Sequence, residues 1–176
     1  LGDEGKGLYK VFEAGKIDKA IGSFFTINKE AIKAWSMGNL KIDLLPQGTL
    51  AEAIRSGGAG IGGFYTPTGV GTRLAEGKEV REIDGVRYLF EKAIKGDIAL
   101  IKAAKSDKAG NLVYHTTARN FNPIMATAAE IVIVEVDEIV EIGELSPEEI
   151  ITPHIFVDYI IESKYIKQGG AYVEAK

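Results

Sequence analysis

Residues 57–72 form the stretch that most constrains how this chain folds. The sequence there is Gly-Gly-Ala-Gly-Ile-Gly-Gly-Phe-Tyr-Thr-Pro-Thr-Gly-Val-Gly-Thr, which holds seven of the 21 glycines of the chain. Fixing a glycine costs more backbone entropy than fixing any other residue, so this density requires positive φ angles or a close approach to another backbone or a ligand. A flexible linker would be richer in serine and charge. We interpret the stretch as an ordered loop that faces a ligand, with a purely structural crossing as the alternative.

The composition limits the class of protein. A chain of 176 residues with 45% hydrophobic residues is typical of one globular domain with its own core. We therefore expect a single domain over residues 1–163, followed by a loose tail over residues 164–176. A net charge of −4 argues against nucleic acid or an anionic membrane surface as the main partner. No apolar window is long enough to span a bilayer.

Residue types and the first residues add further expectations. The chain has no cysteine and two histidines, which excludes disulfides, thiolate metal sites, a cysteine nucleophile and a histidine-rich metal site. The sequence begins at Leu1 as though it enters in the middle of a fold, so we expect residues upstream of it. No signal peptide is visible, and we expect a cytoplasmic protein.

Hydrophobic patterning predicts an α/β fold. Asn28 is placed to cap a helix that runs to Met37, and Thr49 with Glu52 has the spacing of a capping box. Asp84-Gly85 predicts a type I′ turn that joins residues 79–83 and 86–90 into a hairpin. Apolar or alternating runs predict strands at about 20–27, 40–45, 98–104, 112–115 and 131–136.

Gln47 and Gly48 follow the predicted strand 40–45 and precede a helix. In an open α/β sheet ligands bind at such a point, because backbone N–H groups and the helix dipole point outward there. We expect Gln47 either to contact a ligand or to stabilise the turn. The run Gly58-Ala59-Gly60-Ile61-Gly62-Gly63 matches a dinucleotide fingerprint in letters only, because a helix precedes it and Phe-Tyr-Thr-Pro follows it. A dinucleotide site is therefore rejected.

Polar side chains in the second half of the chain offer fewer candidates. Asn120 and Asn122 flank Phe121 and suit either hydrogen bonds to a polar substrate or an Asx turn with a helix cap. His115 is interpreted as a side chain at a strand edge rather than as a base, because no acidic partner is near it in sequence. The acidic residues after the strand at 131–136 suit the solvated end of that strand better than a pair of catalytic carboxylates.

Several motifs together resemble the first (α or A) subunit of the family I CoA-transferases. The residues that carry the match are Leu45-Pro46-Gln47-Gly48-Thr49-Leu50-Ala51-Glu52, the run from Gly57 through Phe64-Tyr65-Thr66-Pro67-Thr68-Gly69 to Thr72, Gly96-Asp97, 102–111, 118–122, 134–136 and 142–143. They occur in the family's order and spacing. The family's opening Gly-Gly-Phe-Gly segment has no counterpart, which fits a chain that lacks its N-terminal part.

The resemblance implies an open, mostly parallel sheet flanked by helices, with β-hairpins, as in sugar-phosphate isomerases. It implies a ping-pong transfer of CoA between a short-chain acyl-CoA and a short-chain fatty or 3-oxo acid, with CoA as substrate and no cofactor. The family's nucleophilic glutamate lies in a Ser-Glu-Asn-Gly motif of the second (β or B) subunit. This chain lacks that motif, so none of its glutamates is assigned as the nucleophile. The resemblance therefore implies the β subunit of a CoA-transferase as partner, in a heterodimer or heterotetramer.

The resemblance also implies which residues bind substrate or CoA. Gln47 is expected to hydrogen-bond the acyl or carboxylate group, and the glycine-rich loop is expected to line the pocket with backbone N–H groups. The full expected set is Gln47, Gly48, Gly60, Phe64, Tyr65, Thr66, Asn120 and Asn122. Two alternatives stay open: a sugar-phosphate isomerase, for which the chain shows a loop but no acid–base set, and a non-catalytic domain that binds or senses acyl-CoA.

Overall fold

The computed structural model describes residues 5, 7–168 and 171–174. The chain folds into two compact units, the first made of residues 1–50 and 65–91 and the second of residues 51–64 and 92–176. The expectation of one domain over residues 1–163 stays a prediction. In the described part of the chain, no helix is both long and apolar enough to cross a membrane.

The first unit begins with a pair of parallel strands, each preceded by a helix. Helix α1 (Leu8–Glu13) leads to β1 (Lys19–Gly22), and α2 (Lys29–Ser36) leads to β2 (Lys41–Leu44), with Ala20 opposite Ile42. The predicted cap is confirmed, because the Oδ1 of Asn28 accepts a hydrogen bond from the backbone N–H of Ala31 at 2.8 Å. The expected strand over 20–27 is shorter than predicted: after Gly22 the chain turns so that Phe25 enters the core beside Ala20, Ala31 and Leu40.

A three-stranded sheet, most of whose residues belong to the first unit, has the strand order β3-β5-β4. Its strands are β3 (Gly63–Thr66), β4 (Val80–Ile83) and β5 (Val86–Lys92), and the short helix η1 (Arg73–Ala75) precedes β4. The predicted hairpin is confirmed, since β4 and β5 pair antiparallel and both turn residues have positive φ, 51° at Asp84 and 78° at Gly85. This is the backbone that a type I′ turn requires.

One ion pair in this sheet gives a first stability prediction. Glu91 is only 8% exposed, and its carboxylate accepts from the ammonium group of Lys78 at 2.6 Å. We expect Lys78→Ala to lower the free energy of unfolding by about 2 kcal/mol, because a buried carboxylate then loses its cation. Lys108→Ala breaks an exposed pair with Glu141 and should cost less than about 0.5 kcal/mol. Urea unfolding of both variants measures the difference, and equal losses would contradict this interpretation.

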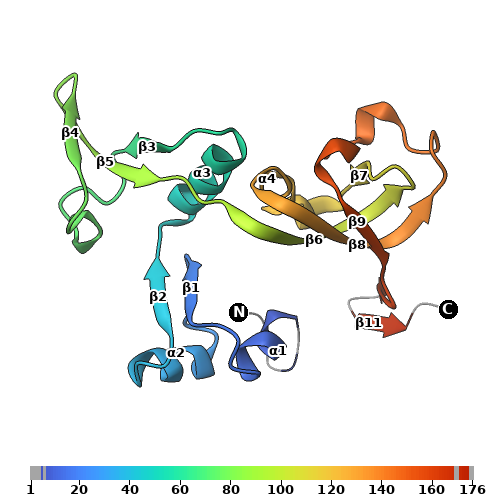
Figure 1. Ribbon diagram of the computed structural model, residues 1–176, viewed down its shortest axis with the longest axis horizontal. Coiled ribbons are helices and arrows are strands. Elements are labelled where there is room, and N and C mark those ends of the chain that lie inside the picture. The colour runs from blue at the N-terminus through green and yellow to red at the C-terminus, as the bar shows by residue number, and fades with distance from the viewer. Residues whose placement is uncertain (1–4, 6, 169–170, 175–176) are drawn as a thin grey trace. The chain divides into compact units, whose positions relative to one another are not determined.

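The second unit is built on a four-stranded sheet in the order β7-β6-β8-β9 (Figure 1). The long strands β6 (Gly96–Asp107) and β8 (Ala129–Val140) run parallel, as do β8 and β9 (Tyr159–Glu162), and only β7 (Leu112–Val113) is antiparallel. This confirms the expected α/β architecture with a mostly parallel sheet. The strands predicted at 98–104 and 131–136 are found, each extended at both ends, whereas the strand predicted at 112–115 stops at Val113.

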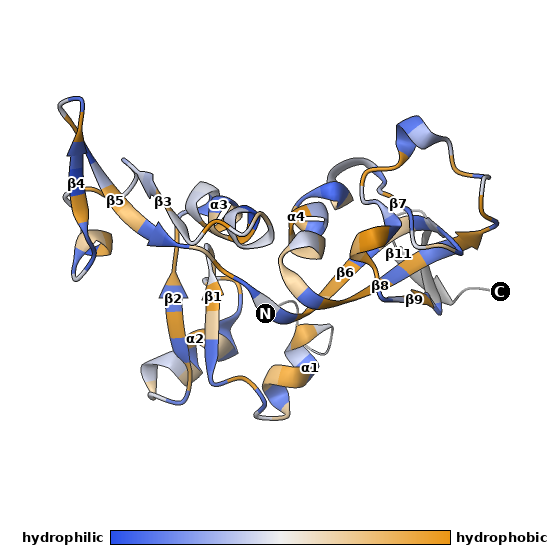
Figure 2. Cartoon of the chain, turned by 45° about the horizontal axis from the view of Figure 1, so that its top comes forward, coloured by the Kyte–Doolittle hydropathy of each residue, from blue (hydrophilic) through white to orange (hydrophobic). Residues whose placement is uncertain are grey.

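One face of this sheet carries the core of the second unit. Every second residue in the middle of β6 and β8 is apolar and buried on the same side, and Figure 2 shows hydrophobic stretches on both strands. Helix α4 (Asn122–Thr127) packs against this face through Ala126 and Met125. The short helices η2 (Thr116–Arg119), η3 (Pro147–Glu149) and η4 (His154–Phe156) lie in the connections. The buried strand residues are Ala99, Ile101, Ala103, Val132, Val134 and Val136.

Two expectations about chain ends and caps are corrected by the structure. Helix α3 (Gln47–Gly58) begins two residues before the predicted capping box, because the backbone N–H of Leu50 already bonds to the carbonyl of Pro46. Thr49 thus lies inside the helix, and Glu52 instead forms two hydrogen bonds with Arg55. Within the expected loose tail at 164–176, β10 (Tyr165–Gln168) and β11 (Ala171–Glu174) form an antiparallel hairpin, and positions 169–170 and 175–176 lie outside the described residues.

Candidate functional site

The first two glycines of the glycine-rich stretch form a close crossing. A Cβ atom built on Gly57 would lie 2.0 Å from the carbonyl oxygen of Ile94, and one built on Gly58 would lie 2.1 Å from the Oγ1 of Thr127. Real Cβ atoms do not approach other atoms so closely. The end of α3 therefore lies against the segment before β6 and the end of α4 because neither glycine has a side chain. At these two positions the glycines therefore serve a structural crossing, which was the alternative to a loop that faces a ligand.

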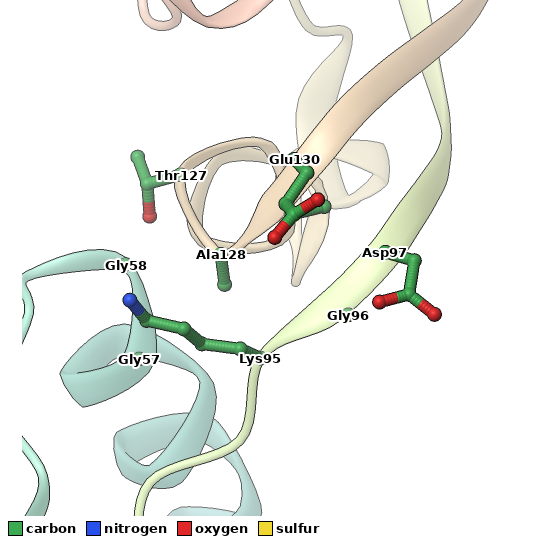
Figure 3. A pocket seen from close by; sticks show the side chains of 9 residues that line it. Gly57, Gly58, Lys95, Gly96, Asp97, Thr127, Ala128 and Glu130 are labelled. Atoms are coloured by element: carbon green, nitrogen blue, oxygen red, sulfur yellow. The ribbon is translucent and has the colours of Figure 1, made fainter.

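A small pocket opens beside this crossing, with a volume of about 180 Å³. Figure 3 shows the side chain of Lys95 reaching toward Gly58, with the carboxylates of Glu130 and Asp97 on the strands nearby. The pocket lies where β6 and β8 begin, whereas ligands of open α/β sheets bind where the strands end. Its lining residues are Gly57, Gly58, Lys95, Gly96, Asp97, Thr127, Ala128, Ala129 and Glu130.

Gln47 and Gly48 are the first two residues of α3, and both are exposed. The strand that precedes them, β2, ends at Leu44, so they stand at the carboxyl end of a parallel strand and at a helix N-terminus. Backbone N–H groups at a helix start lack partners within the helix and favour negatively charged groups. The sequence predicted that both residues precede the helix, whereas they form its first turn. Contact with a substrate stays a prediction.

Tyr65 on β3 is held by side chains of the β4–β5 region. Its hydroxyl donates a hydrogen bond to the carboxylate of Glu79, its ring centroid lies 5.3 Å from that of Phe90, and the guanidinium of Arg81 lies 5.5 Å from the ring centroid. The hydrogen bond to Glu79 raises the pKa of the Tyr65 hydroxyl, because deprotonation would break it. Thr66 follows on the same strand, and its Oγ1 accepts from the backbone N–H of Thr68 at 3.2 Å.

The predicted site residues are divided between the two units. Gln47, Gly48, Tyr65 and Thr66 belong to the first unit, and Gly60, Phe64, Asn120 and Asn122 belong to the second. Gly60 is exposed and has a φ of 72°, the left-handed backbone that the turn after α3 requires. Phe64 is half-buried on β3. None of the eight residues has a tested role, so the expected site stays a prediction.

The two asparagines differ in their surroundings. The Oδ1 of Asn122 accepts from the backbone N–H of Lys102 at 3.1 Å, and its Nδ2 donates to the carbonyl of Ala118 at 2.6 Å. Asn120 is exposed and lies between η2 and α4 with a φ of 24°. Asn122 is therefore engaged by the protein itself, whereas Asn120 is exposed to solvent.

The acidic residues of β8 pair with lysines of β6. The Nζ of Lys102 lies 3.1 Å from the Oε1 of Glu135 and 2.5 Å from the Oδ1 of Asp137. Burial by itself lowers the pKa of Lys102, but the hydrogen bonds to Asp137 and Glu135 outweigh it and raise that pKa. The hydrogen bond from Ser163, with the ion pair to Lys102, lowers the pKa of Glu135. Both carboxylates are therefore engaged in ion pairs with Lys102, in keeping with the solvated strand end expected from the sequence.

Sequence patterns missed the residues that support the candidate site. Glu79 and Arg81, which contact Tyr65, were not singled out, although the two-residue spacing around the start of β4 is a signal that places them on one face. His115 is exposed at the start of η2. Within the described residues, no three histidine, aspartate or glutamate side chains are grouped as a metal site would require.

Comparisons with known proteins agree on one family. A family model described as Coenzyme A transferase matches residues 2–163. The chain is 47% identical to the A subunit of succinyl-CoA:3-ketoacid coenzyme A transferase from Xanthomonas campestris pv. campestris (strain B100), over 96% of this chain and 73% of that protein. It is also 47% identical to the α subunit of acetate CoA-transferase from Escherichia coli (strain K12), over 92% of this chain and 73% of that protein.

A solved structure extends the likeness to the fold. Glutaconate coenzyme A-transferase from Acidaminococcus fermentans superposes with a TM-score of 0.79 at 15% sequence identity. The match covers 87% of this chain and 57% of the other. At this identity the likeness concerns the fold alone.

Proposed function

Because this chain belongs to the coenzyme A transferase family, we propose that it is the α subunit of an enzyme that moves CoA between a short-chain acyl-CoA and a short-chain fatty or 3-oxo acid. The observation that carries the proposal is the match of residues 2–163, together with relatives of nearly half-identical sequence that are named as the A or α subunits of such transferases. The motifs around Gln47 and through residues 57–72 lie within this match.

The proposed reaction is a ping-pong exchange with a nucleophile on a partner, the β subunit. A glutamate carboxylate supplied by that partner attacks the thioester carbonyl, and the C–S bond breaks to give a mixed anhydride and CoA thiolate. The thiolate attacks the glutamyl carbonyl of the anhydride and releases the first acid, which leaves a glutamyl-CoA thioester. The second acid repeats these steps in reverse order and departs with CoA. A covalent intermediate conserves the reactivity of the thioester between the two half-reactions.

The role proposed for this chain is to orient the substrate. Gln47 offers an exposed amide at the start of α3, where unpaired backbone N–H groups and the helix dipole favour an oxyanion. Such donors stabilise negative charge that develops on the carbonyl oxygen in the transition state. None of the glutamates in residues 1–176 lies in a Ser-Glu-Asn-Gly motif, so the nucleophile is assigned to the partner.

We expect Gln47→Ala to lower kcat by about 10- to 100-fold, since it removes a donor near the reacting carbonyl. The rate is measured in the purified complex with its candidate β subunit, and gel filtration checks that the complex still assembles. Glu52→Ala on the same helix removes an exposed pair with Arg55 and serves as the matched control. Unchanged kinetics in Gln47→Ala would rule out this role for the residue.

The function itself is tested by CoA exchange between acetyl-CoA and acetoacetate or butyrate. The full-length protein is assayed alone and after co-expression with a candidate β subunit from the same genome. Activity only in the mixture, with a borohydride-sensitive glutamyl-CoA adduct on the partner, is the expected result. Activity of this protein alone would contradict the placement of the nucleophile. Tight acyl-CoA binding without exchange in either sample would favour a sensing domain and overturn the proposal.

A further inference from the structure

Asn120 holds a backbone conformation that glycine normally adopts. Its φ of 24° and ψ of −121° are followed at Phe121 by a φ of −81° and a ψ of −15°. This pair of conformations follows the pattern of the two central positions of a type II′ turn, whose first position glycine usually fills. A side chain at such a position strains the backbone. The strain persists only where surrounding structure imposes it.

Asn122 supplies that surrounding structure. Its amide joins the backbone N–H of Lys102 on β6 to the carbonyl of Ala118 in η2, at 3.1 and 2.6 Å. Lys102 is fixed in turn by its ion pairs with Glu135 and Asp137. The Asn122 amide therefore closes the turn between η2 and α4 and ties it to a central strand of the sheet.

The side chain of Asn120 is exposed, and within the part of the chain that the structure describes it makes no hydrogen bond or ion pair. Glycine would form the same turn with less strain. The asparagine amide is thus held in a costly position, next to the exposed Arg119. Local strain of this kind is typical of residues that a binding site positions.

We propose that Asn120 donates its side-chain amide to a carbonyl or carboxylate oxygen of the substrate, and that Asn122 is the positioning residue that holds it there. The inference rests on the proposed function, which supplies a substrate rich in such oxygens. Asn120 then contacts the substrate, whereas Asn122 acts through the backbone of the turn. Asn122 is not expected to touch substrate.

The test compares stability with activity in the complex of the full-length protein and its β subunit. Asn120→Gly should raise the melting temperature by about 2–4 °C, because the strain is relieved, and should lower kcat/KM by about 10- to 100-fold, because a donor is lost. Asn120→Asp keeps a residue that tolerates positive φ but removes the NH₂ donor, and it should lose activity to a similar degree. Asn122→Ala should lower both the melting temperature and the activity.

Asp84→Gly is the matched control, since Asp84 also has a positive φ but lies in the turn of the β4–β5 hairpin. It should keep full activity. Competition by free CoA shows which oxygen is bound: weaker inhibition of Asn120→Gly indicates the pantetheine chain, and unchanged inhibition indicates the acyl group. A more stable Asn120→Gly with full kcat/KM, or a less stable one, would overturn the inference. An inactive wild-type complex would instead overturn the proposed function, and the stability comparison would still decide whether the Asn120 side chain is structural.

Discussion

Gly57→Ala is expected to lower the free energy of unfolding by about 3 kcal/mol. The added Cβ would lie 2.0 Å from the carbonyl oxygen and 2.8 Å from the carbonyl carbon of Ile94. Both are backbone atoms, and the N–H of Ile94 donates a hydrogen bond to the carbonyl of Ala53 at 2.9 Å. Ile94 therefore cannot move aside without loss of that bond. The end of α3 must instead separate from the segment that leads into β6.

Gly62→Ala is the matched control from the same stretch. Nothing lies within 4 Å of a Cβ at this position, and its φ is not in the left-handed region. Alanine there should be neutral or stabilise the protein by up to about 1 kcal/mol, because it restricts the unfolded chain. Urea unfolding followed by circular dichroism measures both variants. If Gly57→Ala were as stable as Gly62→Ala, the close crossing of α3 would be wrong.

The glycine-rich stretch shows where sequence reasoning stops. Its density of glycine predicts correctly that most of it is ordered for a specific reason. A close approach to a ligand and a close approach to another backbone require the same residue, however, and only coordinates separate them. Gly57 and Gly58 contact the chain itself. Gly60 contacts nothing within 4 Å of its missing side chain and stays a candidate for the ligand.

Local patterns succeeded where the cause of the structure is local. The Asp84-Gly85 turn and the Asn28 cap were predicted correctly, since turn and cap geometry depend on a few consecutive residues. The capping box at Thr49 failed although its spacing was right. There the helix begins at Gln47, directly after Pro46. The hydroxyl oxygen of a threonine inside the helix then finds no unpaired backbone N–H from which to accept a hydrogen bond.

The candidate site depends on contacts between distant residues, which the sequence alone does not reveal. Asn122 is distinguished from Asn120 by a bond to the backbone of Lys102, twenty positions away. The acidic end of β8 becomes a set of ion pairs only because the parallel register places Lys102 opposite Glu135. The local pattern around the asparagines does not reveal the contact with Lys102, so the sequence led to the same prediction for both.

Asp107→Ala is expected to lower the free energy of unfolding by about 3–5 kcal/mol at neutral pH. Asp107 ends β6 and is 2% exposed. Its Oδ1 accepts from the backbone N–H groups of Ala109, Gly110 and Asn111 at 3.1, 3.0 and 2.9 Å, and its Oδ2 accepts from the Asn111 amide at 2.8 Å. Alanine would leave these donors without their acceptor in a turn that also positions Asn111 against the backbone of His154.

The pH dependence of stability shows how much of the contribution of Asp107 depends on its negative charge. Burial by itself would raise the pKa of this carboxyl, but the hydrogen bonds from Asn111, Gly110 and Ala109 outweigh it and hold the pKa below its usual range. In the unfolded chain the group titrates near pH ~3.9, so its contribution to stability is complete above that pH and disappears as the pH falls through the lower folded value.

Asp107→Asn should therefore be less stable than the wild type at pH ~7 and lose less stability than the wild type between about pH 4 and about pH 2.5. Urea unfolding at several pH values measures this variant beside the wild type. A profile of Asp107→Asn that runs parallel to that of the wild type would mean that the turn needs an acceptor at this position but not a charge. Because the turn joins β6 to β7, a steeper acid loss in the wild type would place the acid-sensitive point of the second unit at the end of a central strand.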